Sequence, residues 1–220
     1  MLFRSDIAEM LDNVLNYFIE HAPDTIKRAV YSAMRERSIG IGALGFHALL
    51  QKKGIAFEGV LAKSLNNRIF KHIRAGLDQA NYDLAMIRGS CPDAKDAGLK
   101  RRFTHMTAIA PNASSSIIMG NTSPSIEPYA ANAYRQDTSS GAYITKNRFL
   151  DEIVKKKAEE MQDSEAWYNE TWASIIANDG SVQHLEWMDE EVKYVFKTAF
   201  EIDQRWIVEH AADRQKYIDQ

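Results

Sequence analysis

Apolar residues recur at three- and four-residue intervals along the first part of the chain, which predicts helices that each bury one face. The first helix is expected to end near residues 21–23, and its apolar stripe consists of Ile7, Leu11, Val14, Phe18 and Ile19. A second helix is expected from Asp24 or Thr25, either of which can cap it, to about Glu36, and a third over about residues 41–54.

The longest predicted helix covers residues 60–88, where apolar positions from Leu61 to Ile87 keep helical spacing and Gly89 supplies a stop. The pattern then changes. Residues 106–110 form a short apolar run, closed by Pro111, that is typical of a buried strand.

The region after this strand begins as a polar loop. Two segments further along have the composition of strands. A small polar loop covers residues 112–116, and strands are predicted over 131–136 and 142–145, separated by turn-prone residues 137–141. Four further helices are predicted over residues 149–161, 164–177, 189–196 and 198–214, with a break at 178–181.

These elements predict a mostly helical segment with a few short central strands. Within one domain over residues 1–220, we expect helices over 1–104, a strand and loop region over 105–148, and helices over 149–220. Because loops between regular elements commonly carry function, the central region is where a site is expected. Helical pattern continues into residues 217–220, which suggests a piece of a longer polypeptide.

Composition bounds the class of function. The chain has 220 residues, 45% of them apolar and 26% charged, and a formal net charge of -3, which provides no overall basic field to collect nucleic acid. Arg4 and Asp6 come too early for a secretory signal, and no membrane span is expected. Because Cys91 is the only cysteine, no internal disulfide forms and the reducing cytoplasm is the expected compartment.

Three features suggest chemistry but favour structural roles. Residues 40–45 (GIGALG) match the G-x-G-x-x-G string of dinucleotide-binding folds, yet no hydrophobic strand precedes them, so we interpret these glycines as sites of close helix packing. Cys91 lies at a helix exit, in no pattern typical of a nucleophile. The 6 histidines are scattered without metal-ligand spacing, so no metal site is expected.

The loop after residue 110 has two interpretations. A strand that ends in Pro111 and continues as Asn-Ala-Ser-Ser-Ser can present consecutive backbone N–H groups and hydroxyls to an anion. The same composition is also typical of a solvated serine-rich turn that caps a helix. The residues alone leave both interpretations open.

Several ungapped strings, in order along nearly the whole chain, resemble the large (alpha) subunit of ribonucleotide reductase. They are residues 34–47 (MRERSIGIGALGFH), 89–92 (GSCP), 108–117 (AIAPNASSSI), 121–128 (NTSPSIEP), 180–184 (GSVQH) and 200–206 (FEIDQRW). The resemblance implies part of a ten-stranded α/β barrel, in an enzyme that makes deoxyribonucleotides by thiyl-radical chemistry under allosteric control.

The resemblance also implies a site. In the family, the loop after the Ala-Pro strand end binds the substrate's phosphates, which maps onto Pro111, Asn112, Ala113, Ser114 and Ser115. Many relatives carry Thr or Ser in place of Asn112, and some carry Glu in place of Ala113. Neither change removes a backbone donor, so phosphate binding is still expected, although the side-chain contacts differ.

No catalytic residue is expected in this segment. The family's reaction needs three thiols. This chain has a single cysteine, Cys91, at a position outside the reacting set. The family's catalytic Cys, Asn and Glu lie before the matched region, and its Tyr-Tyr relay and cysteine-bearing tail lie after it. No Tyr-Tyr pair occurs here.

The resemblance further implies partners and cofactors. They are a nucleoside diphosphate, the remainder of the large subunit, a radical-generating small subunit with a di-metal centre, ATP and deoxynucleotide effectors, and a thioredoxin or glutaredoxin type of reductant. We expect this segment itself to bind no cofactor. Two alternatives stay open: a cobalamin-dependent reductase that uses adenosylcobalamin, and a non-catalytic helical interaction module.

Overall fold

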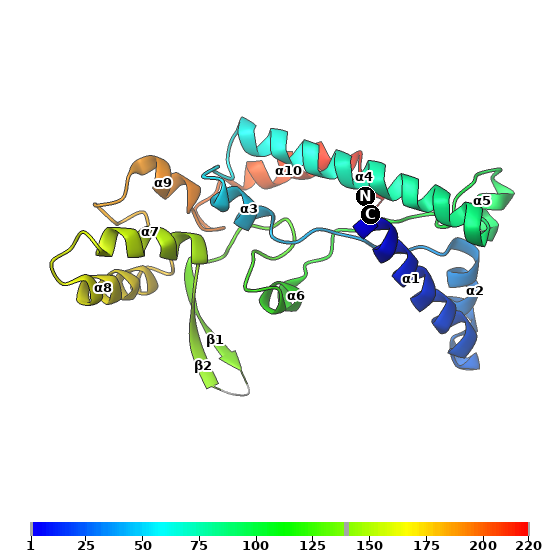
Figure 1. Cartoon of the computed structure of the whole chain (residues 1–220), viewed down its shortest axis with the longest axis horizontal. Coiled ribbons are helices and arrows are strands. Elements are labelled where there is room, and N and C mark those ends of the chain that lie inside the picture. The colour runs from blue at the N-terminus through cyan, green and yellow to red at the C-terminus, as the bar shows by residue number, and fades with distance from the viewer. Residues whose placement is uncertain (1, 139–140, 220) are drawn as a thin grey trace. The chain divides into compact units, whose positions relative to one another are not determined.

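The computed structural model describes residues 2–138 and 141–219. Both ends of the predicted 1–220 domain and the centre of the predicted turn, Ser139 and Ser140, therefore lie outside the described residues. The elements (Figure 1) are α1 (Leu2–His21), the 3-10 helix η1 (Asp24–Ile26), α2 (Lys27–Glu36), α3 (Phe46–Lys52), α4 (Val60–Arg88), α5 (Pro92–Asp96), α6 (Ala113–Ile118), β1 (Ala133–Thr138), β2 (Gly141–Lys146), α7 (Arg148–Ala158), α8 (Ser164–Ala177), α9 (Glu190–Val195) and α10 (Gln204–Gln215).

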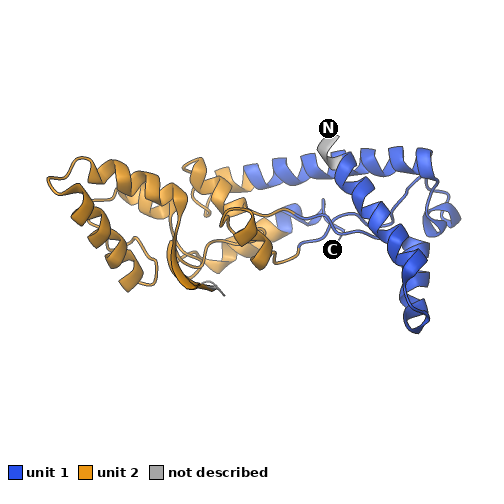
Figure 2. Cartoon of the chain, turned by 60° about the horizontal axis from the view of Figure 1, so that its bottom comes forward, with its two compact units in different colours: residues 1–42, 65–109, 212–220 blue, residues 43–64, 110–211 orange. Residues whose placement is uncertain are grey.

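The chain divides into two compact units (Figure 2). Unit 1 comprises residues 1–42, 65–109 and 212–220, and unit 2 comprises residues 43–64 and 110–211. Both units are discontinuous in sequence, whereas the division predicted at 104/105 and 148/149 is contiguous. The predicted division describes only the order of elements along the chain, and it remains a prediction.

Most predicted elements are confirmed. Helices α4 and α8 have the predicted bounds, and the predicted strands form an antiparallel hairpin whose register pairs Ala133 with Lys146 and Thr138 with Gly141. Helix α7 ends at Ala158, earlier than predicted. None of the helices in the described residues is long and apolar enough to cross a membrane.

The predicted strand over residues 106–110 is wrong in extent. One parallel bridge joins Thr107 to Ile41, supported by hydrogen bonds from Ile41 N–H to the Met106 oxygen (2.8 Å) and from Ala108 N–H to the Ile41 oxygen (3.3 Å). Residues beyond this bridge have no strand partner within the described part of the chain. The segment is therefore extended and paired at one point rather than a full strand.

This pairing also corrects the predicted third helix, which begins at Phe46 instead of about residue 41. The chain before it is extended, because it pairs with residues 105–108. A Cβ added to Gly42 would lie 2.6 Å from the Ala108 carbonyl oxygen, so only glycine permits this approach. The predicted close packing of the glycines is thus present, but against an extended segment and not against a helix.

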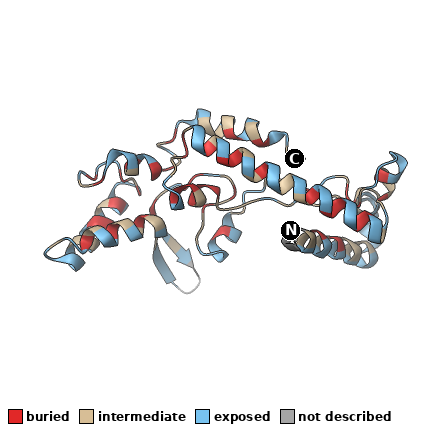
Figure 3. Cartoon of the chain, turned by 45° about the horizontal axis from the view of Figure 1, so that its top comes forward, coloured by how far each residue is buried: buried red, intermediate tan, exposed pale blue. Residues whose placement is uncertain are grey.

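In unit 1, buried side chains lie along one face of α4 (Figure 3), where Leu77, Ala80 and Leu84 pack with Ala8 and Phe103. The predicted apolar ends of this helix are exposed: Leu61 is 70% and Ile87 79% exposed. The predicted stripe of α1 also needs a correction, because Val14 is 57% exposed, whereas Ala8 and Asp12, which lie outside the stripe, are buried.

Asp12 is buried because three guanidinium groups surround its carboxylate. Arg37 (2.6 Å) and Arg102 (2.9 Å) donate to Oδ1, and Arg88 (2.8 Å) donates to Oδ2. Burial by itself raises the pKa of Asp12, but the bonds from Arg102, Arg88 and Arg37 outweigh it and lower that pKa below its ordinary value. This carboxylate joins α1 to three other segments of unit 1, a long-range pairing that periodicity does not reveal.

A second carboxylate holds the extended segment of unit 1. Asp219 Oδ2 accepts hydrogen bonds from the N–H groups of Met106 (2.8 Å) and Thr107 (3.1 Å), and Oδ1 accepts one from Arg74 (2.6 Å). Burial raises the pKa of Asp219, but these bonds outweigh it and lower the pKa to about 2.

The core of unit 2 lies between α7 and α8 and the loops that follow them. It contains Trp172, Leu150, Val154, Ile175 and Val182. The hairpin joins it at its foot, where Ala133 is part of the core and the Lys146 ammonium lies 4.3 Å from the Tyr168 ring centroid. Since an isolated two-stranded hairpin is marginal in water, these contacts at the foot are what hold it.

Helix α10 begins at Gln204, later than the predicted residue 198. The chain before it is a turn, in which Glu201 accepts a hydrogen bond from the Thr198 N–H (2.7 Å). The buried Glu58 carboxylate accepts bonds from the Asp203 N–H (2.6 Å) and the Lys197 ammonium (2.9 Å). The Glu58 bond occupies the N–H of Asp203, the residue before α10, which in a helix starting at 198 would instead donate to the Ala199 carbonyl.

A buried amide joins the segments of unit 2. Asn132 Nδ2 donates to the carbonyl oxygens of Phe196 (2.7 Å) and Gly180 (3.0 Å), and its Oδ1 accepts from Asn147 (3.0 Å). Asn147 also donates to Gln51 on α3 (2.8 Å) and caps α7 through its Oδ1. Asn132, which is 1% exposed, therefore bonds directly to three other points of the chain, and Asn147 extends this network to α3.

The Asp219 bonds predict a pH dependence. Because the folded-state pKa lies below the unfolded value, the carboxylate's stabilising contribution is present above about pH 4 and is lost as pH falls from about 4 to about 2. We expect Asp219→Asn to lower the free energy of unfolding near neutral pH, with the difference from wild type shrinking across that window. Chemical denaturation at a series of pH values measures this difference. A difference of constant size from pH 6 to pH 2, like that of the exposed control Asp24→Asn, would contradict it.

The Asn132 bonds predict a loss of stability on truncation. Asn132→Ala removes the side-chain donor to Phe196 O in a buried site, so we expect the free energy of unfolding to fall by about 1–3 kcal/mol. Asn178→Ala is the matched control, because its amide also donates to a carbonyl oxygen, that of Ser174 (2.9 Å), but in an exposed position where water replaces it. Denaturant titrations of both variants that gave equal losses would refute the role of burial.

Candidate functional site

The loop singled out by the sequence forms the start of α6. Asn112 lies immediately before the helix, with a φ of 55° in the left-handed region, and its carbonyl accepts the first bond of the helix from Ser116 N–H (2.9 Å). The N–H groups of Ala113, Ser114 and Ser115 precede that bond. Among the residues that the structure describes, none of these groups has a hydrogen-bond partner. Consecutive free N–H groups at a helix start form a place where an anion can bind.

The side chains of the loop leave this helix start open. The Asn112 side chain makes no capping hydrogen bond, and Ser114 and Ser115 are exposed. The third serine differs, because Ser116 is buried and its hydroxyl donates to the Ala113 oxygen (2.7 Å). The expectation of a serine that caps the helix start is therefore not met, and two hydroxyls are free to contact a ligand.

A cavity of about 230 Å³ lies beside α6. Its lining comes from the first turns of α6, the segment after it and the start of the hairpin: Ala113, Ser116, Ile117, Thr122, Pro124, Tyr129, Ala130, Ala131 and Tyr134. Most of these side chains are apolar, so the cavity provides little polar recognition of its own. Ala113 belongs both to the lining of this cavity and to the candidate phosphate loop.

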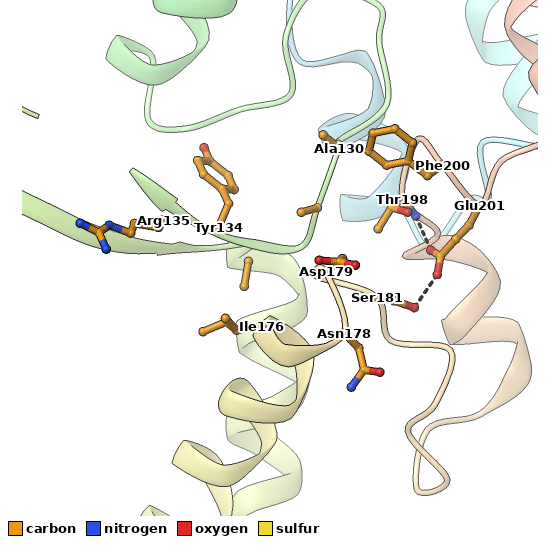
Figure 4. A pocket seen from close by; sticks show the side chains of 12 residues that line it. Ala130, Tyr134, Arg135, Ile176, Asn178, Asp179, Ser181, Thr198, Phe200 and Glu201 are labelled. Atoms are coloured by element: carbon orange, nitrogen blue, oxygen red, sulfur yellow. Dashed lines mark hydrogen bonds between the residues drawn. The ribbon is translucent and has the colours of Figure 1, made fainter. Parts of the chain in front are cut away.

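A larger cavity of about 610 Å³ adjoins it, because both share Ala130, Ala131 and Tyr134 (Figure 4). On the side opposite Tyr134, Glu201 accepts hydrogen bonds from the Ser181 hydroxyl and the Thr198 N–H (Figure 4). These bonds fix the turn that carries Phe200, whose side chain is 87% exposed at the mouth of the cavity.

Other residues considered from the sequence lie away from the loop. Cys91 is buried, with 0% exposure, and belongs to unit 1, where its N–H donates to the Arg101 oxygen (3.0 Å). No group of three metal-ligating side chains occurs within residues 2–138 and 141–219.

Sequence reasoning missed Tyr129 and Asn132, which lie close behind the loop. Neither belongs to a motif of known chemistry, and both act through hydrogen bonds to distant backbone groups. The signal available for Asn132 is a polar residue inside a predicted strand, next to the buried Ala133. Nothing in the sequence pattern singles out the Tyr129 hydroxyl.

Comparisons with known proteins agree with the resemblance. The family model for the ribonucleotide reductase barrel domain matches residues 4–101 and 93–220. Ribonucleoside-diphosphate reductase large subunits of two viruses are similar: that of Invertebrate iridescent virus 6 is 55% identical over 100% of this chain, and that of Invertebrate iridescent virus 3 is 53% identical over 99%. The chain spans only 22% and 34% of those two proteins.

A solved structure agrees in fold. The class Id ribonucleotide reductase alpha subunit of Actinobacillus ureae superposes with a TM-score of 0.86 at 40% identity, over 99% of this chain and 38% of that one. The mostly helical architecture with two short strands is accordingly that of a part of an α/β barrel. Because the family model covers nearly every residue, this chain belongs to the ribonucleotide reductase barrel-domain family.

Proposed function

We propose that this chain is part of a ribonucleoside-diphosphate reductase large subunit, in which it supplies the loop that binds the substrate's phosphates. The observation that supports this most directly is the start of α6, where three N–H groups without partners and two exposed hydroxyls lie together. The relatives that share this sequence carry the name of that enzyme.

The role of the loop is to bind and orient. Free N–H groups at a helix start carry a partial positive charge, which stabilises a diphosphate without a cationic side chain. Holding the diphosphate fixes where the ribose lies, and such positioning lowers the entropic cost of the reaction. In this proposal Pro111 ends the incoming segment, Asn112 turns the chain, and Ala113, Ser114 and Ser115 supply the donors.

The reacting groups come from elsewhere in the enzyme. The chain has a single cysteine, Cys91, which is buried in unit 1. We therefore assign the redox thiols to the remainder of the large subunit. We assign radical generation to a separate small subunit, because the solved relative is a class Id alpha subunit. That relative favours this assignment over the cobalamin-dependent alternative. A thioredoxin or glutaredoxin type of protein would return the electrons.

The first test is a titration of the 220-residue chain with a nucleoside diphosphate and, separately, with inorganic pyrophosphate, followed by NMR of its backbone amides. We expect saturable shifts at Ala113, Ser114 and Ser115. Absence of shifts at these amides with both probes would refute the phosphate loop and would favour the non-catalytic helical module.

Serine substitutions test the hydroxyls. Ser114→Ala and Ser115→Ala should each weaken diphosphate binding about 2- to 10-fold, the effect of losing one hydrogen bond of ~0.5–1.5 kcal/mol. In the enzyme assembled with its missing parts, both should raise KM and leave kcat nearly unchanged, since the loop positions substrate and does not react. The matched control is Ser164→Ala, in the first turn of α8, which should change neither value. Unchanged kinetics in both loop variants would remove this assignment.

A further inference from the structure

Helix α6 is held by few contacts. Of its residues, Ser116 alone is buried, and Ile118 is 83% exposed. Part of the space beside its first turn is the cavity of about 230 Å³. Core packing therefore does not fix the direction in which the three N–H groups point, and the segment that follows the helix must do so.

That segment is bound to the start of α3, where Ser123 accepts bonds from Gly45 N–H (2.8 Å) and Ala48 N–H (3.1 Å). Nearer to α6, it is held by the hydroxyl of Tyr129. The hydroxyl donates a hydrogen bond to the carbonyl oxygen of Asn121 (3.1 Å), three residues beyond the end of α6. The same stretch is tied back to the helix, because Asn121 N–H donates to the Ile117 oxygen (3.2 Å) and Thr122 N–H donates to the Ser116 oxygen (3.2 Å). Burial raises the pKa of Tyr129 to about 12, so the phenol stays a donor at neutral pH.

The backbone of Tyr129 is itself fixed on both sides. Its N–H donates to Nδ1 of His47 (2.9 Å), and its carbonyl accepts from Ala199 N–H (2.7 Å). His47 is completely buried, and this burial lowers its pKa to about 3, so the ring is neutral and Nδ1 remains an acceptor. Tyr129 thus connects the rigid base of unit 2 to the end of α6.

We propose that Tyr129 is a positioning residue for the phosphate loop, acting through the Asn121 carbonyl to fix the orientation of α6. This inference rests on the proposed function, since it concerns the same loop. Its physical basis is preorganisation: when the helix is already oriented, less conformational entropy is lost as the phosphates bind. Removing the hydroxyl leaves the ring in place and releases its bonds to the segment from Asn121 to Ser123.

The test compares Tyr129→Phe with wild type in the full 220-residue chain. We expect inorganic pyrophosphate to bind about 3- to 10-fold more weakly, as loss of one hydrogen bond predicts. In the free protein the amide resonances of Ala113, Ser114 and Ser115 should shift, a signature that a general loss of stability does not produce at temperatures well below Tm. Tyr31→Phe is the matched control, because Tyr31 lies on α2 and is 61% exposed.

The outcomes separate the two proposals. If wild type binds pyrophosphate and Tyr129→Phe binds it equally, with unmoved loop amides, the positioning role is wrong and the phosphate loop stands. If neither binds, the phosphate loop is wrong and the positioning role falls with it. An equal weakening in Tyr31→Phe would also overturn the positioning role, because the effect would then not depend on the link to Asn121.

Discussion

Unit 2 depends on one constraint, the need of buried polar groups around residues 129–132 to find partners. A buried carbonyl or N–H without a partner costs about 1–3 kcal/mol, so each bond here excludes alternative paths of the chain. Asn132 bonds two carbonyls, and His47 of α3 accepts from the Tyr129 N–H. Asn147 joins Asn132 to Gln51, also on α3. Both cavities are lined by residues of this short stretch, and the Tyr129 hydroxyl links it to the segment after α6.

The network consists of neutral groups, and this has consequences for the site. Amides and an unprotonated imidazole keep their donors and acceptors over a wide range of pH, whereas carboxylates lose theirs in acid. In unit 1, the carboxylates of Asp12 and Asp219 join the segments through charge-assisted hydrogen bonds. The imidazole of His47 in unit 2, with a pKa of about 3, and the carboxylate of Asp219 in unit 1, with a pKa of about 2, both keep their bonds until the pH is strongly acidic.

The sequence predicts elements well where local signals agree. Helices α4 and α8 are predictable in full because their spacing is regular and a glycine or a polar cap ends or begins them. The loop is predictable because small polar residues follow a proline. The errors share a cause: the extended stretch around Ile41 depends on Thr107, and the late start of α10 depends on Glu58. Such pairings join distant residues, so no local pattern contains them.

The loop geometry also bears on the differences from the family that are expected at residues 112 and 113. At residue 112 the backbone has a φ of 55°, a conformation that asparagine adopts with little strain and that β-branched threonine avoids. At residue 113 the side chain is exposed at the edge of the cavity. Neither residue removes a backbone donor, so in the proposed function the loop relies on main-chain geometry more than on side-chain identity. A loop of this kind depends on whatever orients its backbone, and in this chain that dependence falls on the segment from Asn121 to Tyr129.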